Sequence, residues 1–531
     1  MKKKIVSLLL GLLLCVSIVA CSSDKTSNVT DEVLVEEGKS KFEMEGASYI
    51  ELSDNLIMVD GDEVTTSSEE AVYVANDIVY YEEGQDFTYG EGTKEDEHSK
   101  EEAQKHTVVH ITKPGTYVLR GELSAGQIAV DLGEDAKDDS EAVVTLVLDD
   151  VNITCSVAPA VIFYNVYECG SSDEEEATKD VDTSAAGANV LIPDGTNNTI
   201  TGSYVARIYK SVELNEEGTE IVDSKKLHKY DGAFYSKMTM NINGGEENTG
   251  KLNIYAQNEG LDTELHLTLN GGTVNIISGN DGINTNEDNV SVTTINGGYL
   301  NIRVNGQTGE GDGIDSNGWL VINGGVVCTS ACATSMDAGI DSDKGIHING
   351  GTVMAAGNML DHISESQQNY VVFTFQDKIK GGEEITLVKG EESLYASMPN
   401  DYTYLIISKD SLAEGETYTL WKGEEQLRVV ESSGGEMMIP GGFGNGEMPE
   451  GFETGQRPGG FGNGEMPEGF ETGQRPGGFG NGEVPEGFDP SQRPGGGFGG
   501  KGFGRFDVED AMTEFVIKTG GNMYMVVSNK A

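Results

Sequence analysis

One short phrase, a hydrophobic residue followed by Asn-Gly-Gly, occurs five times between Tyr230 and Gly357. Successive copies are 27, 26, 27 and 26 residues apart, with asparagines at Asn243, Asn270, Asn296, Asn323 and Asn349. Regular spacing of this length is typical of stacked structural repeats, each of which buries its apolar residues against its neighbours. The spacing therefore restricts the possible folds more than any other feature of the chain.

Each repeat has short runs of alternating apolar residues on both sides of the Asn-Gly-Gly phrase. Alternation with period two predicts β-strands, and the glycine pair can adopt the positive φ that a tight corner needs. The apolar pairs before the phrase are Met240 and Ile242, Leu267 and Leu269, Leu320 and Ile322, and Ile346 and Ile348. Those after it are Leu252 and Ile254, Val274 and Ile276, and Leu300 and Ile302.

A third segment of each repeat reads Gly-Leu-Asp-Thr at 260–263, Gly-Ile-Asn-Thr at 282–285, and Gly-Ile-Asp-Ser at 313–316 and 339–342. Three short strands per repeat, with no room for a helix, predict an all-β fold of the parallel β-helix type. A β-sandwich with chance repetition is the alternative. The joint recurrence of the corner and both strand patterns favours the β-helix.

Acidic and amide side chains gather in this third segment. Equivalent positions in successive repeats of a β-helix stack about 4.8 Å apart, where two carboxylates repel by about 3.5 kcal/mol at an effective dielectric of 20. Carboxylate and amide oxygens are hard ligands that select Ca²⁺, although a solvated acidic edge without an ion is the alternative. The expected metal ligands are Asp262, Asp281, Asn284, Asp312, Asp315, Asp337 and Asp341, within a wider set that adds Asn258, Glu259 and Asp343.

The N-terminus is typical of a bacterial lipoprotein signal. Three lysines precede an apolar run, and Ile18-Val19-Ala20-Cys21 resembles the box in which the cysteine is lipidated. An ordinary signal peptide or a short membrane helix is the alternative, but the run is short for a membrane span. The expected protein therefore lies outside the cytoplasmic membrane, tethered at Cys21 through a polar linker at 22–47.

The chain carries a net charge of −54. This charge argues against nucleic acid as a partner and against attraction to an anionic membrane. It also suggests that an acidic ligand could be held only through bridging cations. In an oxidising compartment, Cys155 and Cys169 could pair as a disulfide.

The 26–27-residue spacing stops after Gly357, which sets the expected domain order. A β-helix at 48–357 precedes a small β module at 358–431, and a Gly/Pro-rich tract at 432–505 follows. That tract contains the eighteen-residue unit GGFGNGEMPEGFETGQRP from Gly441 and again from Gly459, and its composition predicts disorder. Residues 506–531 are expected to return as the final strands of the β module.

Four phrases in order carry a family resemblance: GTYVLRGELSAGQIAVD, VTLVLDDVNIT, APAVIFYNV and YDGAFYSK. Together with the Asn-Gly-Gly repeats, they resemble the bacterial extracytoplasmic carbohydrate-binding domain family with a calcium-binding, right-handed parallel β-helix. The resemblance spans roughly Tyr49 to Val430. It implies binding of cellulose or polygalacturonate-type (pectic) glycans, without established catalysis, on a fold similar to that of pectate lyases.

Three functions follow as hypotheses. The first is a calcium-dependent, surface-anchored polysaccharide-binding protein, for which Trp319 and Tyr299 are the expected aromatic contacts, although Trp319 could equally pack under a neighbouring repeat. The second is a calcium-dependent polysaccharide lyase, which needs an Arg or Lys base; Lys344 beside Asp341 and Asp343 is the one suggestive arrangement. The third is a structural surface protein stiffened by calcium. The first is our prediction, with no catalytic residues.

Overall fold

The computed structural model describes residues 42–432 and 510–527, and the described residues from Met44 onward belong to one compact unit. This part of the chain is all-β, as the sequence predicts; its α-helix is the four-residue α1 (Lys100–Ala103). No helix within these ranges has the length and apolar character to cross a bilayer. The signal segment with Cys21, most of the linker and nearly all of the Gly/Pro-rich tract lie outside the described residues.

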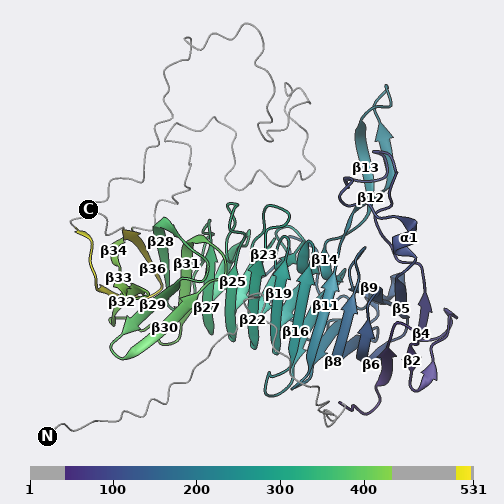
Figure 1. Ribbon diagram of the computed structural model, residues 1–531, viewed down its shortest axis with the longest axis horizontal. Helices are drawn as coiled ribbons and strands as arrows, with labels where there is room; N and C mark the ends of the chain where they lie inside the picture. Colours follow the sequence, from purple (N-terminus) through teal and green to yellow (C-terminus); the bar gives the residue numbers. More distant parts are fainter. Residues whose placement is uncertain (1–41, 433–509, 528–531) are drawn as a thin grey trace, which may run out of the picture. The chain divides into compact units, whose positions relative to one another are not determined.

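Strands from successive repeats pair in parallel in two series within one large sheet, where they stack in sequence order (Figure 1). The strands of the first series precede the corner of their repeat, and each pairs in parallel with the equivalent strand of the next repeat. It comprises β8 (Val144–Thr154), β10 (Ala188–Ile192), β15 (Met240–Gly244), β18 (Leu267–Leu269), β21 (Val292–Ile295), β24 (Trp319–Ile322) and β26 (Gly345–Ile348).

The second series lies on the other side of each corner and is also parallel throughout. It continues from the end of β8 through β11 (Asn197–Gly202), β16 (Lys251–Ala256), β19 (Thr273–Ser278), β22 (Tyr299–Val304), β25 (Val326–Ser330) and β27 (Thr352–Gly357).

The third series forms an eight-stranded sheet whose first pair, β4 (Val72–Ala75) with β5, is antiparallel. All later pairs in this sheet are parallel. They comprise β5 (Thr107–Ile111), β7 (Gly126–Asp131), β9 (Val161–Asn165), β14 (Gly232–Ser236), β17 (Glu259–Thr263), β20 (Ile283–Thr285) and β23 (Ile314–Ser316). The third segment of the repeat therefore forms its own column of strands.

The Asn-Gly-Gly phrases form the corners between the first and second series. In the last four copies the second glycine has a φ of +79° to +85°, which L-residues rarely adopt. The asparagines also bond to one another. Each amide of the later repeat donates to the side-chain oxygen of the preceding one, at 2.9–3.0 Å, from Asn349 back to Asn243. This asparagine ladder fixes the register of five repeats.

The alternating apolar residues of both runs point into the interior, where nearly all are at most 2 % exposed. The large core that they form continues toward the N-terminus through β6 (Gly115–Leu123) and β1 (Ser48–Leu52). The short β2 (Met58–Val59) and β3 (Asp62–Glu63) add antiparallel pairs beside β1. A single 3₁₀ turn, η1 (Glu134–Asp138), precedes β8.

Antiparallel strands end the parallel stacking after β27. β31 (Tyr402–Lys409) pairs antiparallel with both β27 and β28 (Tyr370–Ile379). β36 (Gly521–Val527) then pairs in parallel with β28 and antiparallel with β34 (Arg428–Glu431). A second small sheet comprises β29 (Glu384–Lys389), β30 (Glu392–Ser397), β32 (Thr417–Lys422), β33 (Glu425–Gln426) and β35 (Phe515–Val516). The two sheets share an aromatic core with Phe373, Phe515 and Tyr524.

A long antiparallel hairpin of β12 (Val205–Leu214) and β13 (Ile221–Tyr230) projects from the stack between β11 and β14 (Figure 1). Its turn is closed by Asn215, whose side-chain oxygen accepts a hydrogen bond from the Thr219 amide at 2.9 Å. β13 runs directly into Asp231 and β14. This hairpin was not among the elements expected from the sequence.

Cys155 and Cys169 are free thiols in the structure and not the disulfide considered from the sequence. Cys155 is buried just after β8, and burial raises the pKa of its thiol to about 12. The Cys169 sulfur instead lies 4.0 Å from the backbone carbonyl of Asp182. Each thiol is thus packed in its own protein environment.

Candidate metal centre

The third series places acidic and amide side chains of successive repeats next to one another. Asp262 of β17 pairs in register with Asn284 of β20, which pairs with Asp315 of β23, and the Asp341 amide donates to the Ile314 carbonyl at 2.7 Å. We use the name carboxylate row for the side chains along this column. Its members are Asp231, Glu259, Asp262, Asp281, Asn284, Asp312, Asp315 and Asp341.

Glycines allow the chain to pass close to its neighbours at this column. A Cβ at Gly282 would lie 2.2 Å from Ile302 Cγ2 and 2.6 Å from the Gly313 carbonyl oxygen. A Cβ at Gly232 would lie 2.6 Å from Asp262 Cβ. A Cβ at Gly313 or Gly339, which begin the two Gly-Ile-Asp phrases, would likewise lie 2.2 Å from the Gly339 carbonyl oxygen or 2.5 Å from the Ala356 nitrogen. Such separations are too short in a packed interior, so these glycines are packing requirements.

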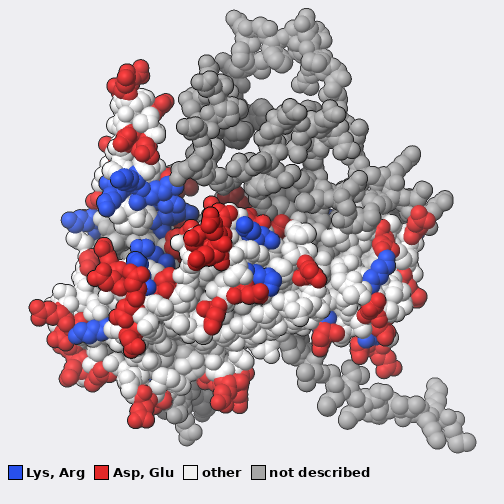
Figure 2. Space-filling model, turned by 180° about the vertical axis from the view of Figure 1, so that it is seen from behind, with Lys and Arg blue, Asp and Glu red and all other residues white. Residues whose placement is uncertain are grey.

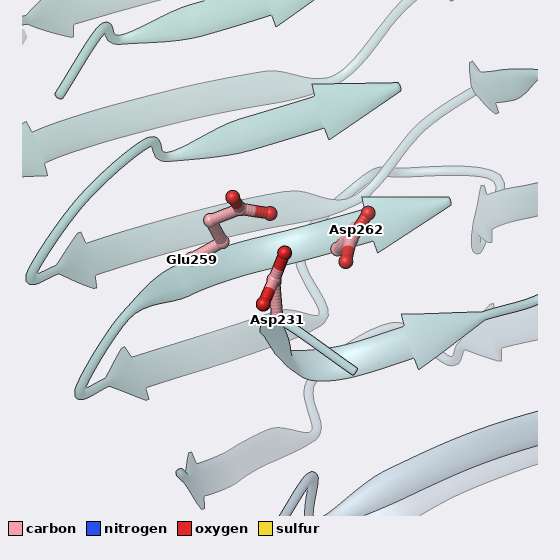
Figure 3. Close-up of side chains that lie close together, drawn as sticks. All are labelled: Asp231, Glu259 and Asp262. Atoms are coloured by element: carbon pink, nitrogen blue, oxygen red, sulfur yellow. The ribbon is translucent and has the colours of Figure 1, made fainter. Parts of the chain in front are cut away.

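Three carboxylates form the first cluster of the row. Glu259 and Asp262 lie on β17, and Asp231 lies before the neighbouring strand β14 with its carboxylate directed toward them (Figure 3). One oxygen from each lies within 4.8 Å of the others. All three are almost fully buried, and Asp262 is 0 % exposed. Lys229, at the end of the hairpin, forms an ion pair with Asp231.

A second cluster lies two repeats further along the row, where Asp312, Asp315 and Asp341 have oxygens within 4.8 Å of one another. It is less enclosed than the first, because Asp315 is only partly buried. Asp281 lies between the clusters, and its carboxylate accepts a hydrogen bond from the Asp312 amide at 2.6 Å. Asp312 in turn accepts one from the Ala338 amide at 2.5 Å.

Burial and mutual repulsion disfavour the charged forms of these side chains. Burial, followed by the neighbouring Asp231 charge, raises the pKa of Glu259 to about 8. Burial and then adjacent carboxylates also hold the pKa values of Asp262, Asp281 and Asp312 well above the usual range. Burial alone would lower the pKa of Lys229, but Asp231 and Glu259 raise it above its ordinary value. The carboxylates of the row can therefore be accommodated in the folded protein only when they are protonated or paired with cations.

Several oxygens of the row have no hydrogen-bond partner among the described residues although they are buried. These are Glu259 Oε2, Asp262 Oδ2 and Asn284 Oδ1. An unpartnered buried oxygen is costly, and oxygens of these types are ligands that a hard divalent cation accepts. Carboxylate and amide oxygens without a nearby thiolate fit Ca²⁺ better than a transition metal. The residues present therefore fit the expected ion.

The structure groups most of the expected ligands but spreads them over two clusters. Asp262 belongs to the first, and Asp312, Asp315 and Asp341 form the second. Asn284 contacts the first cluster, since its amide donates to Glu259 Oε1 at 3.2 Å. Asp337 is not in either three-carboxylate group; its carboxylate accepts from the Gly311 amide at 2.6 Å and from the Ser335 hydroxyl.

Asp231 is the ligand candidate that the sequence analysis missed. It lies before the first complete Gly-Ile-Asp repeat and is one position out of register with Glu259, which pairs with Gly232. The only sequence signal was its place in the phrase YDGAFYSK, one residue before a glycine. Glu259 was in the wider acidic set but not among the expected ligands.

The two aromatic candidates differ in exposure. Tyr299, at the start of β22, is 40 % exposed, and Tyr255, near the end of β16 in the same series, is 46 % exposed. Trp319 is half-buried, and the Lys344 ammonium lies 5.7 Å from its ring centroid. Lys344 also lies 3.8 Å from a carboxylate oxygen of Glu174. Of the two expected residues, Tyr299 has the more accessible ring.

The stacked parallel strands and the carboxylate row define an all-β repeat protein with a buried acidic column. A family model described as "Carbohydrate-binding domain-containing protein" matches residues 105–398, more than half of the chain. The protein therefore belongs to this carbohydrate-binding family.

A solved structure that the chain resembles is titled "Structure of the polysaccharide lyase-like protein from C. thermocellum, Gadolinium derivative". The two share 19 % sequence identity, the match covers 60 % of this chain and 97 % of the other, and the TM-score is 0.32. No curated protein matches the chain.

Proposed function

We propose that this protein binds polysaccharide outside the cytoplasmic membrane and depends on Ca²⁺ to do so. Membership of a carbohydrate-binding family supports the ligand class. We take the three parallel series to be the sides of a right-handed parallel β-helix. Lipidation at Cys21 would tether the protein to the membrane surface, in keeping with the signal-like N-terminus.

One observation carries the calcium proposal: buried carboxylates with raised pKa values and unpartnered oxygens occur in a column set by strand register. A surface acidic patch would be solvated and would need no ion. Within the stack most of these carboxylates are buried, so metal binding contributes directly to the stability of the fold.

The two clusters suit different roles. The first (Asp231, Glu259 and Asp262) is enclosed by protein, so an ion held there would act on structure alone. The second is partly open at Asp315. An ion held there could keep a coordination position for a carboxylate of an acidic, pectic sugar. Tyr299 and Tyr255 supply exposed aromatic rings on which a pectic or cellulosic chain could pack.

The surroundings of the row favour binding over catalysis. A lyase would need an unprotonated Arg or Lys close to the metal-bound sugar. Lys229 lies at the first cluster, but its raised pKa keeps it protonated and it is ion-paired with Asp231. Lys344, the sequence candidate, is directed toward Trp319 and Glu174.

Calorimetry on metal-free full-length protein tests the first half of the proposal, and we expect heat on titration with Ca²⁺. Retention on insoluble pectate and cellulose, with Ca²⁺ and with chelator, tests the second half. Heat without retention on either glycan would indicate a structural surface protein. Sustained growth of ultraviolet absorbance on polygalacturonate with Ca²⁺ would instead show a lyase, and absence of heat would reject the calcium site.

A further inference from the structure

We propose that the lower part of the β12–β13 hairpin, with the groove beside it, is a second glycan site that binds anionic, uronate-containing polysaccharide without metal. We call this part, with its basic residues Arg207, Lys210, Lys225, Lys226 and Lys229, the hairpin stem. The inference rests on the proposed polysaccharide-binding function and adds to it a separate site that needs no metal.

The hairpin stem is positive on a strongly negative protein. The hairpin contributes five of the chain's 35 basic residues. Figure 2 shows Lys and Arg side chains gathered over its lower part, beneath an acidic tip. Arg207 pairs with Glu91 and Lys229 with Asp231. Among the described residues, Lys210, Lys225 and Lys226 form no ion pair, so their charges are directed at solvent.

An open groove of about 350 Å³ lies at the base of the same hairpin. This volume falls within the usual range for sites of small ligands, which are lined mainly by apolar and aromatic groups. The groove is lined by the aromatic Tyr80, Tyr89 and Tyr209, by apolar side chains that include Leu227, by His228 and by the acidic Glu82 at one side. Leu227 is 51 % exposed. The groove therefore offers aromatic faces to a ring-shaped ligand.

Strand register places charge beside these rings. Tyr209 and Lys226 are directly paired across the hairpin, so their side chains lie on the same face. Lys210 and Lys225 are the sequence neighbours of this pair, and because side chains alternate along a strand they lie toward the other face of the hairpin. A polymer whose rings rest on the tyrosines would thus bring its substituents toward the Lys226 ammonium group.

The groove is built before any ligand binds. The Tyr209 amide donates to the Tyr89 carbonyl at 2.8 Å, and the Glu91 amide donates to the Arg207 carbonyl at 2.9 Å. The Tyr209 hydroxyl donates to Glu91 at 3.2 Å, and the Tyr81 and Tyr89 rings pack at 5.1 Å. These contacts hold the segment around Tyr80 to Glu91 against the hairpin, which reduces the ordering cost of binding.

Uronate chains match both features, because each sugar has an apolar ring face and a carboxylate. A neutral glycan would use the tyrosines but not the lysines. A polyphosphate would use the lysines but not the aromatic groove. The combination of rings and ammonium groups therefore selects an acidic polysaccharide, and this binding should weaken with salt.

The test is binding of soluble polygalacturonate to full-length protein with chelator, measured by calorimetry at two salt concentrations. The variant is Lys225→Gln/Lys226→Gln. The control Lys137→Gln/Lys179→Gln removes the same charge at two lysines elsewhere, each of which pairs with the aspartate next to it in sequence. A third variant, Leu227→Asp, alters the groove at an exposed position. We expect Lys225→Gln/Lys226→Gln and Leu227→Asp each to bind polygalacturonate about tenfold more weakly than the unmodified protein. The control should bind it with unchanged affinity.

Each outcome separates this site from the proposed calcium function. Absence of binding by the unmodified protein with chelator, or equal loss in the control, would overturn the hairpin site while leaving calcium-dependent binding intact. Tighter binding of polyphosphate than of polygalacturonate would also overturn it. Absence of glycan binding with Ca²⁺ as well as with chelator would reject the proposed function itself.

Discussion

The carboxylate row and the hairpin stem lie two residues apart in the chain, at Asp231 and Lys229, yet they handle charge in opposite ways. The row is negative, buried and assembled from successive repeats by strand register. The stem is positive, largely exposed and formed by one local hairpin. The net charge of −54 describes neither region. Burial determines whether a charge affects folding or only binding.

This contrast has an energetic basis. Exposed charges are well solvated, and single ion pairs among them contribute about 0–1 kcal/mol. Buried carboxylates must lose their charge or find a counter-ion, and removing one partner of such a group leaves an uncompensated charge. Changes to the row should therefore alter stability, whereas changes to the exposed lysines of the stem, Lys210, Lys225 and Lys226, should alter affinity alone.

The largest expected effect is the response of stability to pH and Ca²⁺. The pKa of Glu259 is raised from 4.5 to about 8, so the folded protein binds this proton more tightly than the unfolded chain. The contribution of this tighter proton binding to the free energy of unfolding is fully present below about pH 4.5 and is lost as the pH rises through about 8. Metal-free protein should unfold at a lower temperature at pH 8 than at pH 5.

Calcium should reverse this loss, because it neutralises the carboxylates that protons no longer neutralise. Ca²⁺ at a concentration about one hundred times the Kd of a single site adds about 2.7 kcal/mol to the free energy of unfolding. The thermal shift on adding Ca²⁺ should be larger at pH 8 than at pH 5, and smaller in Glu259→Gln. A shift independent of pH would place the ion away from these groups.

A smaller effect is expected from the geometry of the row. Gly282→Ala would put a Cβ 2.2 Å from Ile302 Cγ2, and overpacking of this kind costs about 1–3 kcal/mol. Gly218, in the hairpin turn, is the matched control, since its Cβ would meet nothing within 4 Å and only its φ of +69° opposes alanine. Denaturant unfolding should show the larger loss for Gly282→Ala, together with weaker Ca²⁺ binding. Equal losses would mean that the row is not tightly packed.

Much of this architecture could be predicted from the sequence because period and composition act locally. The spacing of Asn243 to Asn349 predicts the repeat length. The alternating apolar residues predict two strands in each repeat, and their apolar side chains are buried in the structure. The all-β class is confirmed. The positive φ expected at the corners is present at Gly272, Gly298, Gly325 and Gly351.

Other features depend on contacts that no local pattern encodes. β14 keeps the register of the later repeats, with Phe234 opposite Leu261, and Asp231 joins Glu259 and Asp262 from the position just before this strand, which the Gly-Ile-Asp pattern does not include. The hairpin interrupts the repeat order, and its lysines were hidden in the overall negative charge. The asparagine ladder required knowing that the corners stack directly upon one another. The identities of the ion and the glycan remain predictions.

The asparagine ladder provides a way to separate register from charge. Asn296 donates to Asn270 and accepts from Asn323 at 2.9 and 3.0 Å, across the same repeats as the row but without ionisable groups. Asn296→Ala should cost about 1 kcal/mol, and denaturant unfolding should give the same loss at pH 5 and pH 8, with or without Ca²⁺. A loss that varied with pH or Ca²⁺ would show that the ladder and the row are coupled.

The smallest expected change in stability belongs to the stem. Lys225 and Lys226 are exposed and form no ion pair among the described residues, so Lys225→Gln/Lys226→Gln should change the free energy of unfolding by less than about 0.5 kcal/mol. Denaturant unfolding with and without Ca²⁺ measures this directly. Because the same variant is expected to lose affinity for polygalacturonate, a stable but weakly binding protein would show that the stem's charges serve the ligand. A marked loss of stability would instead assign these lysines to the fold and remove the contrast with the row.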